Sequence, residues 1–513
     1  MVRKAHFDRT LAAVIFFFSL FLVFGFARIH FETHHTGLMY RTALDVANGQ
    51  LLFRDTFTKY GAVTVLLQTL GILLLGRRVT SILWISALFY AACYALFYLL
   101  ARRFLPRTFS LALTLLSLLL APFYFWDFIP WSSIFALFFT LLAAYLYTTP
   151  HAHRPLLHAA VGACGALAFF CRQPVGITMF VAAFFCYAFL ARRYRNLQKT
   201  CWFLLGTLGV LAAFLLPFAA LGILDDFYEQ SLVGMFRTAV DPSLLGSSPL
   251  DAICRILYCL LIAPLTHTQY AGSAIFLLLP LCSISMFFLS FKKQGKRAED
   301  ILFISALALS AWHQYYPVPC QRHFYWGAFL SLLPLGLLIY IFARACARNK
   351  VRFLAVSLAF LFTAPVVSRV WDGAQKLSDD TRIYYENEAH PDLNGLLLRP
   401  QVAYHFDTTF ACIDALRAHF PERNVVNLTQ NEFYSILGEP FYALYDSTCY
   451  YLDADEILTD YIRTHRPIVI ANEAPDESYL LYHAALGDHN DDWFDYHDLP
   501  ANIYVPKELF FSL

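Results

Sequence analysis

Residues 79–101 have the sequence VTSILWISALFYAACYALFYLLA, which runs for 23 residues without a charged side chain. A helix needs about 20 largely apolar residues to cross a hydrocarbon core roughly 30 Å thick. Ten further apolar runs come close to this length. They are residues 11–28, 108–126, 131–148, 155–171, 173–190, 200–222, 271–291, 299–315, 324–343 and 351–368. The sequence therefore predicts a bundle of about eleven transmembrane helices.

The composition of the whole chain supports this interpretation. The chain has 513 residues, of which 58% are hydrophobic, and its mean hydropathy is +0.52. A soluble protein does not need this much apolar material for its core, so lipid is the expected solvent for most of the chain. Only helices and closed barrels can span a bilayer, and these runs have the length of helices. The first run follows a basic N-terminus, as in a signal peptide, but no convincing small-residue cleavage site follows it, and we interpret it as a retained anchor.

Basic residues gather in every second connection between the predicted helices. Cytoplasmic loops of membrane proteins carry such an excess of Lys and Arg. The N-terminus is then cytoplasmic, provided that the short apolar runs 62–76 and 253–265 lie in the interface or re-enter instead of crossing. This topology places Arg77 and Arg78 on the extracytoplasmic side, although the rule expects basic residues in cytoplasmic loops. The basic connections contain Arg102, Arg103 and Arg107, then Arg192, Arg193, Arg195 and Lys199, then Lys292, Lys293, Lys296 and Arg297, and then Arg344, Arg348, Lys350 and Arg352.

The remainder of the chain, residues 371–513, is acidic, with 25 acidic side chains against 8 basic ones. Anionic cytoplasmic headgroups would repel such a domain, and an odd number of helices places it outside. Helical and strand patterns alternate in it, which predicts a small α/β extracytoplasmic domain after a transmembrane domain of residues 1–370. The predicted helices are 408–420, 431–437 and 455–465, and the predicted strands are 424–428 and 467–471.

Two features of this domain leave alternatives open. Cys412 and Cys449 could form a disulfide in an oxidising compartment or remain reduced. The acidic run Asp488–Asp498 could bind a cation or form a solvated edge. The domain contains no phosphate-binding loop and no metal-ligand spacing. We therefore expect it to cover a site in the membrane domain or to bind an acceptor.

Polar and aromatic side chains collect in the loops that this topology places outside, above all in the first outer loop, residues 29–78. Ionisable groups near hydrocarbon are costly and tend to be functional. Carboxylates, imidazoles and guanidiniums in one place can deprotonate a hydroxyl and bind a phosphate leaving group. The alternative is an interfacial belt that anchors the helix ends. The candidate residues are Glu32, His34, His35, Tyr60, Asp127, Arg172, Gln173, Arg322, His323 and Trp326.

Within the first outer loop, residues 37–61 have the sequence GLMYRTALDVANGQLLFRDTFTKYG. This loop resembles the first periplasmic loop of the GT-C glycosyltransferases, a superfamily that includes protein O-mannosyltransferases and aminoarabinose transferases. The shared features are an alanine-containing helix, a small-residue turn, an Arg54-Asp55 pair and Tyr60-Gly61. The resemblance extends weakly to Arg172-Gln173 and to the stretch from Tyr316 to His323, so it spans most of the membrane domain.

The resemblance implies a GT-C-like fold and a multi-pass protein of the bacterial inner membrane. Such enzymes move a sugar from a polyprenyl-phosphate carrier to a glycan, lipid or protein acceptor in the cell envelope. An inverting displacement is implied, with a first-loop carboxylate as base or metal ligand and Asp127 as the assisting second-loop acid. A divalent cation, magnesium or manganese, would bind Glu32 and Asp127 if the reaction uses one. The implied substrate-binding residues are Arg172, Gln173, Arg322, His323, Tyr60 and Trp326.

One departure from the family pattern affects the catalytic residues. Just before Gly37, where the family usually has acidic residues, this chain has His34-His35-Thr36. Either Glu32 takes the catalytic role, or His34 or His35 serves as the base, or the chain has lost its chemistry. The other acids of the loop have ordinary explanations, Asp45 as part of a solvated helix face and Asp55 as a turn-forming residue.

Two other classes of function stay open. A transporter or flippase of lipid-linked sugars also needs outward-facing polar groups, but transporters tend to place them near the membrane midplane and to contain internal repeats. A catalytically inactive GT-C-like scaffold would account for the histidines before Gly37. The sequence gives no indication of nucleic-acid binding, and it does not identify the sugar, the acceptor or the oligomeric state.

Overall fold

We describe the chain from a computed structural model, which covers residues 2–29, 31–122, 128–150, 154–239, 248–266, 274–345, 371, 381–429, 431–438, 454–484 and 501–512. Every predicted membrane run that begins before residue 345 coincides with a helix, whereas 351–368 lies outside the described residues. The bundle helices are α1 (Val2–Ala27), α4 (Val79–Ala101), α5 (Arg107–Leu119), α6 (Ser132–Tyr147), α7 (Pro155–Cys171), α8 (Gln173–Tyr194), α9 (Gln198–Ala220), α15 (Ile275–Phe291), α16 (Lys296–Ala311), α17 (Gln321–Ala328) and α18 (Leu332–Ala345).

Several of these helices can cross a bilayer. Within the described part of the chain, 6 helices are long and apolar enough to do so by length and composition. The shorter helices α5, α6, α7 and α15 are apolar as well. The chain is a multi-pass membrane protein, and the count of eleven spans stays a prediction. The 6 long helices are His6–Ala27, Val79–Ala101, Gln173–Tyr194, Gln198–Ala220, Pro249–Thr266 and Gln321–Arg344.

Helices α7 and α9 pack through glycines. A Cβ atom on Gly162 of α7 would lie 1.9 Å from the carbonyl oxygen of Phe203, and one on Gly206 of α9 would lie 1.8 Å from that of Ala159. Lipid tails are as apolar as the side chains, so helices in a membrane associate mainly by close packing, for which small residues are suited. The glycines allow these two backbones to touch.

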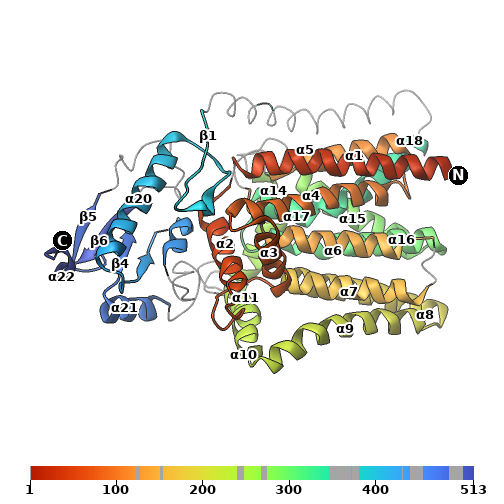
Figure 1. Cartoon of the computed structure of the whole chain (residues 1–513). Helices are drawn as coiled ribbons and strands as arrows, with labels where there is room; N and C mark the ends of the chain where they lie inside the picture. The colour runs from red at the N-terminus through yellow and green to blue at the C-terminus, as the bar shows by residue number, and fades with distance from the viewer. Residues whose placement is uncertain are drawn as a thin grey trace.

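The first helix is an integral part of the bundle. It packs along α4, and the carboxylate of Asp8 accepts hydrogen bonds from Tyr98 at 3.1 Å, Arg102 at 3.1 Å and Arg107 at 2.9 Å. These contacts lie at the end of the bundle that holds the N-terminus, opposite the C-terminal domain (Figure 1). One acidic residue therefore pairs with part of the predicted basic end, and the retention of this helix as an anchor stays a prediction.

Two further helices, α2 (Thr33–Ala47) and α3 (Ala62–Leu75), lie across the end of the bundle that faces the C-terminal domain (Figure 1). On α3, Leu66, Leu70, Leu73 and Leu74 are exposed, whereas the opposite face is buried. This spacing of three and four residues forms one apolar stripe, which is typical of a helix lying in the membrane interface. The arrangement agrees with the prediction that run 62–76 does not cross.

The second short run forms a continuous helix made of α13 (Pro249–Leu257), η3 (Tyr258–Ile262) and α14 (Ala263–Thr266). Its Cys259 sulfur lies 3.6 Å from the carbonyl oxygen of Pro317, which follows η4 (Trp312–Tyr315) after α16. The helix is long and apolar enough to cross a membrane. That it does not cross therefore stays a prediction.

The C-terminal domain contains a four-stranded mixed sheet of order β3-β4-β6-β5, in which β3 and β4 are parallel and β6 is antiparallel to both of its neighbours. The predicted strands and helices are all present, although 431–437 is a 3-10 helix, and the sequence patterns missed β5 and β6. Cys449 and the run Asp488–Asp498 lie outside the described residues. The elements are β1 (Ile383–Tyr384), η6 (Pro391–Leu393), β2 (Leu397–Leu398), α20 (Pro400–His419), β3 (Val425–Asn427), η7 (Glu432–Leu437), α21 (Ala454–His465), β4 (Ile468–Ala471), β5 (Tyr479–His483), β6 (Asn502–Pro506) and α22 (Lys507–Phe510).

Buried polar contacts attach this domain to the first outer loop. The hydroxyl of Tyr40 on α2 donates to the carboxylate of Asp392 at 2.6 Å, and Nε of Arg77 donates to the same oxygen at 2.9 Å. Asp392 is almost fully buried. The acidic domain therefore supplies a buried carboxylate partner for Arg77, one of the two basic residues that the predicted topology placed outside.

Candidate functional site

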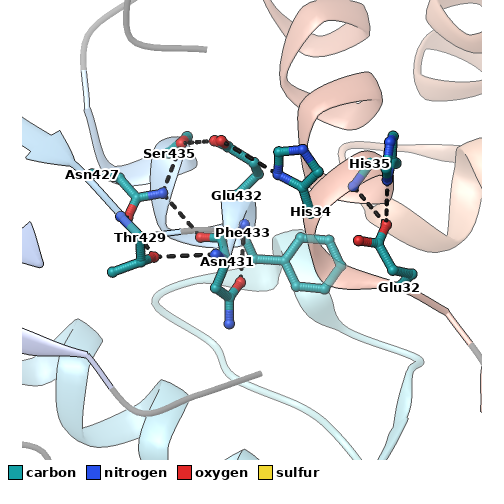
Figure 2. A network of polar contacts seen from close by, with 9 residues as sticks. All are labelled: Glu32, His34, His35, Asn427, Thr429, Asn431, Glu432, Phe433 and Ser435. Carbon is teal, nitrogen blue, oxygen red and sulfur yellow. Dashed lines mark hydrogen bonds and ion pairs between the residues drawn. The ribbon is translucent and has the colours of Figure 1, made fainter. Parts of the chain in front are cut away.

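The N-terminus of α2 holds a carboxylate–imidazole pair. Glu32 is the N-cap residue of α2, and its Oε2 accepts the backbone N–H of His35 at 2.6 Å. The ring nitrogen Nδ1 of His35 lies 3.1 Å from the same oxygen (Figure 2). A carboxylate at this position satisfies a free N–H of the first turn and interacts favourably with the helix dipole. Glu32 and His35, which the sequence offered as alternative bases, thus form one unit.

The indole of Trp131, the N-cap residue of α6, is the centre around which predicted site residues gather. These side chains come from the first loop and from α17, which are far apart in the sequence. The distances from the Trp131 ring centroid are 4.7 Å to the His35 ring, 5.6 Å to the Tyr60 ring, 6.0 Å to the Trp326 ring, 6.2 Å to the His323 ring and 5.6 Å to the guanidinium carbon of Arg322.

Trp131 was not among the predicted site residues. A tryptophan at the end of an apolar helix usually belongs to an interfacial belt, and nothing in its local sequence distinguishes this one. In the sequence, only its position near Asp127, in the predicted second outer loop (residues 126–133), pointed to a role in the site. A guanidinium over an indole ring is an attractive arrangement, so Trp131 also helps to place Arg322.

The short connection between α7 and α8 brings a second guanidinium to the same segment. Arg172 donates a hydrogen bond to the hydroxyl of Ser133, two residues after Trp131. Burial lowers the pKa of the Arg172 guanidinium to about 10, which still leaves it cationic at neutral pH. The site therefore contains two positive charges, Arg322 at Trp131 and Arg172 at Ser133. Such groups bind carboxylates and phosphates.

Two predicted substrate-binding residues, Gln173 and Trp326, are buried and have partners within the chain. The side-chain amide of Gln173 is buried and donates to the carbonyl oxygen of Lys59 at 3.4 Å, which joins the α7–α8 connection to the first loop. Trp326 is 2% exposed, and its indole N–H points to the hydroxyl of Tyr90 at 3.4 Å. Substrate contact by these two residues, as by Tyr60, Arg172, Arg322 and His323, stays a prediction.

Gly61 allows the first loop to touch α7. Its N–H donates to the carbonyl oxygen of Cys171 at 3.1 Å, and a Cβ atom at this position would lie 2.0 Å from the carbonyl oxygen of Phe170. We expect Gly61→Ala to destabilise the chain by about 1–3 kcal/mol, because the backbones must separate. The melting temperature of the protein in detergent measures this loss. Gly25→Ala is the matched control, since its Cβ would meet no atom within 4 Å; equal melting temperatures would contradict the argument.

The other acids of the predicted site divide into three cases. Asp127 lies outside the described residues. The interpretation of Asp45 as a solvated residue is wrong, because it is 1% exposed and its carboxylate accepts a hydrogen bond from Nε of Arg41 at 2.9 Å. The turn-forming role of Asp55 agrees with the structure, in which its carboxylate accepts the N–H of Leu51 at 2.8 Å.

The possible cation site can be examined only in part. Among the described residues, no group of three or more His, Cys, Asp or Glu side chains converges in a way that could hold a metal ion. Oε2 of Glu32 already faces two nitrogens of His35, and Asp127 is not described. The described residues do not by themselves form a metal site, and the proposal below derives no step through a metal.

Comparison with known proteins identifies the fold. No family model and no curated protein matches the chain. The similar solved structures include ArnT from Cupriavidus metallidurans in the apo state, with a TM-score of 0.53, 12% identity and 98% of both chains covered. They also include the Archaeoglobus fulgidus oligosaccharyltransferase in complex with Zn and sulfate, with a TM-score of 0.46, 13% identity and 85% of this chain covered, although the chain spans only 57% of that enzyme. The match to ArnT runs almost from end to end of both chains, so this chain has the fold of ArnT, in agreement with the GT-C-like fold that the resemblance of its first outer loop implied.

Proposed function

We propose that the chain is a membrane glycosyltransferase that moves a sugar from a polyprenyl-phosphate carrier to a hydroxyl-bearing acceptor. The observation that carries the proposal is the joint placement of an imidazole–carboxylate pair, His35 and Glu32, and the cation Arg322 around the ring of Trp131. Arg172 adds a second cation, which donates a hydrogen bond to Ser133, two residues after Trp131. A base for the acceptor and cations for a phosphate leaving group are the two requirements of this transfer.

In the proposed reaction, His35 is the general base. Its Nδ1–H donates to the carboxylate of Glu32, which selects the tautomer that leaves Nε2 as an acceptor. The acceptor oxygen forms a bond to the anomeric carbon while its proton passes to Nε2, and the bond between that carbon and the phosphate oxygen breaks. The polyprenyl phosphate leaves with the electron pair of the broken bond, and the charges of Arg172 and Arg322 stabilise it.

The same proposal includes an orientation. We infer that the end of the bundle with α2, α3 and the C-terminal domain faces outward from the bacterial inner membrane, and that the N-terminus is cytoplasmic. The clustering of basic connections at the opposite end supports this orientation. The C-terminal domain, residues 371–513 in this proposal, then lies beside the site, where it can bind the acceptor.

The arginines supply a first test. We expect Arg172→Met and Arg322→Met each to raise the KM for a labelled sugar on polyprenyl phosphate by about 10- to 100-fold, since hydrogen bonds to charged groups contribute about 1.5–3 kcal/mol. Initial rates of label transfer by the purified chain in liposomes measure the effect. Arg193→Met is the matched control, because Arg193 donates only to carbonyl oxygens near Lys293 at the far end of the bundle.

The outcomes of this experiment separate the rival functions. Unchanged KM values in both arginine variants would contradict the assignment of the phosphate site. Movement of the labelled lipid across the liposome membrane without a glycosylated product would favour a transporter or flippase. A chain that binds the labelled lipid but neither moves nor transfers it would favour an inactive scaffold.

A further inference from the structure

A second carboxylate–imidazole pair lies beside the first, and its carboxylate comes from the C-terminal domain. Nδ1 of His34 lies 3.8 Å from Oε1 of Glu432, the first residue of η7 (Figure 2). Both side chains are buried, with 7% and 3% of their surfaces exposed. The two residues are almost 400 positions apart in the sequence. The pairing is therefore a product of the way in which the C-terminal domain sits on α2.

Glu432 is held in place by its own segment. The hydroxyl of Ser435 donates to its Oε2 at 2.5 Å, and the side-chain amide of Asn427 donates in turn to that hydroxyl at 3.1 Å. Asn427 also donates to the backbone carbonyl of Asn431 at 3.0 Å. Every side chain in this chain of hydrogen bonds is buried, and Figure 2 shows them on one side of His34. A buried network with satisfied partners is rigid, so the carboxylate has a defined position.

The backbone of η7 touches α2 one turn after the histidines. A Cβ atom on Gly37 would lie 2.6 Å from the carbonyl carbon of Glu432 and 2.8 Å from the nitrogen of Phe433. The glycine that carries part of the family resemblance is thus the point at which the C-terminal domain approaches α2. The backbones of α2 and η7 are so close at Gly37 that Glu432 has little freedom to move relative to His34.

His34 in turn contacts the proposed base. The His34 and His35 rings meet edge to face with their centroids 4.7 Å apart, and the other neighbour of His35 is the ring of Trp131, also at 4.7 Å. The imidazole of His35 therefore contacts two rings, that of His34, which lies 3.8 Å from Glu432, and that of Trp131 at the start of α6. A displacement of about 1 Å in a catalytic group can lower a rate about 100-fold, so the position of His34 matters to the reaction.

We propose that Glu432 is a positioning residue of the active site: it orients His34 against His35, so that the C-terminal domain completes the site in the membrane domain. This inference rests on the proposed function. It differs from simple docking of the domain, which is also supported by hydrogen bonds from Tyr40 to Asp392 and from Arg41 to the carbonyl oxygen of Ser435. The C-terminal domain then affects the rate of the reaction in addition to covering the site.

A double-mutant cycle on the full-length chain tests the proposal. We expect Glu432→Gln to lower kcat about 10- to 100-fold with the KM for the labelled donor unchanged. His34→Asn should have the same effect, and the double variant should be no slower than either single variant, because both remove one interaction. Resistance to limited proteolysis, measured on each variant, shows that the C-terminal domain stays docked.

Asp392→Asn is the matched control. It removes a buried carboxylate from the same interface but leaves His34 untouched, so we expect the parental kcat. An equal loss in Asp392→Asn and Glu432→Gln, or independent additive effects of Glu432→Gln and His34→Asn, would overturn the positioning role. A parental chain without transfer activity would overturn the proposed function and this inference together, whereas an active parent with an unaffected Glu432→Gln variant would overturn the inference alone.

Discussion

His35→Gln is expected to lower kcat for sugar transfer by about 10²- to 10⁴-fold, the usual contribution of a general base. Glutamine retains a polar group near Glu32 but cannot accept the acceptor proton. Glu32→Gln should cause a loss within the same range, because the amide removes the charge that selects the tautomer of His35. The measurement is the rate of label transfer at saturating donor, normalised to folded protein.

The matched control for this prediction is Asp55→Asn in the same loop. Its carboxylate accepts the N–H of Leu51 in a turn, a role that an asparagine can fill, and its ion pair with the half-exposed Arg54 is weak, so kcat should not change. Asp127→Asn, which the sequence predicts to be as damaging as Glu32→Gln, belongs in the same assay. Parental rates in both His35→Gln and Glu32→Gln would contradict the assignment of His35 as the general base.

Arg41→Met is expected to destabilise the chain by about 3–5 kcal/mol, the cost of breaking a buried ion pair. The guanidinium donates to Asp45 at 2.9 Å and to the carbonyl oxygens of Ser435 at 2.6 Å and Gly438 at 2.9 Å. Removing it leaves the buried carboxylate of Asp45 without this cation and the end of η7 without its donor. Thermal unfolding in detergent and protease cleavage of the C-terminal domain measure the change.

Arg54→Met is the matched control for Arg41→Met. Arg54 also pairs with a nearby aspartate of the first loop, Asp55 at 3.3 Å, but half of its side chain is exposed. Exposed pairs contribute about 0–1 kcal/mol, so its melting temperature should stay close to that of the parent. Equal losses in the two variants would contradict the importance of burial at Arg41.

Much of the architecture could be predicted because it depends on local composition. The run 79–101 is apolar throughout and forms α4, and most of the other predicted spans form helices in the same way. The charge pattern predicted that run 62–76 lies in the interface or re-enters, and this run forms the short helix α3. Arg77 and Arg78 were the exceptions to the predicted charge pattern, and Arg77 pairs with Asp392, a residue too far along the chain for any local pattern to reveal.

The candidate site was predicted in its residue types but not in its pairings. The first loop, the α7–α8 connection and α17 contain the imidazoles and guanidiniums that the sequence singled out. The reading of Asp45 as solvated was wrong, because a local pattern cannot show that the C-terminal domain covers that face of α2 and that Arg41 stays beside it. Trp131 was missed for a related reason, since its role comes from neighbours in other segments.

The sequence by itself determined that this protein is a helical membrane bundle followed by an acidic α/β domain, since hydrophobic runs, charge and strand alternation are local properties of the chain. Only the tertiary structure decided which groups meet. Glu32 pairs with His35 within one helical turn, but Glu432 reaches His34 only because η7 packs against Gly37. Contacts between distant segments depend on the packing of the whole fold, so they cannot be predicted from the composition of either segment.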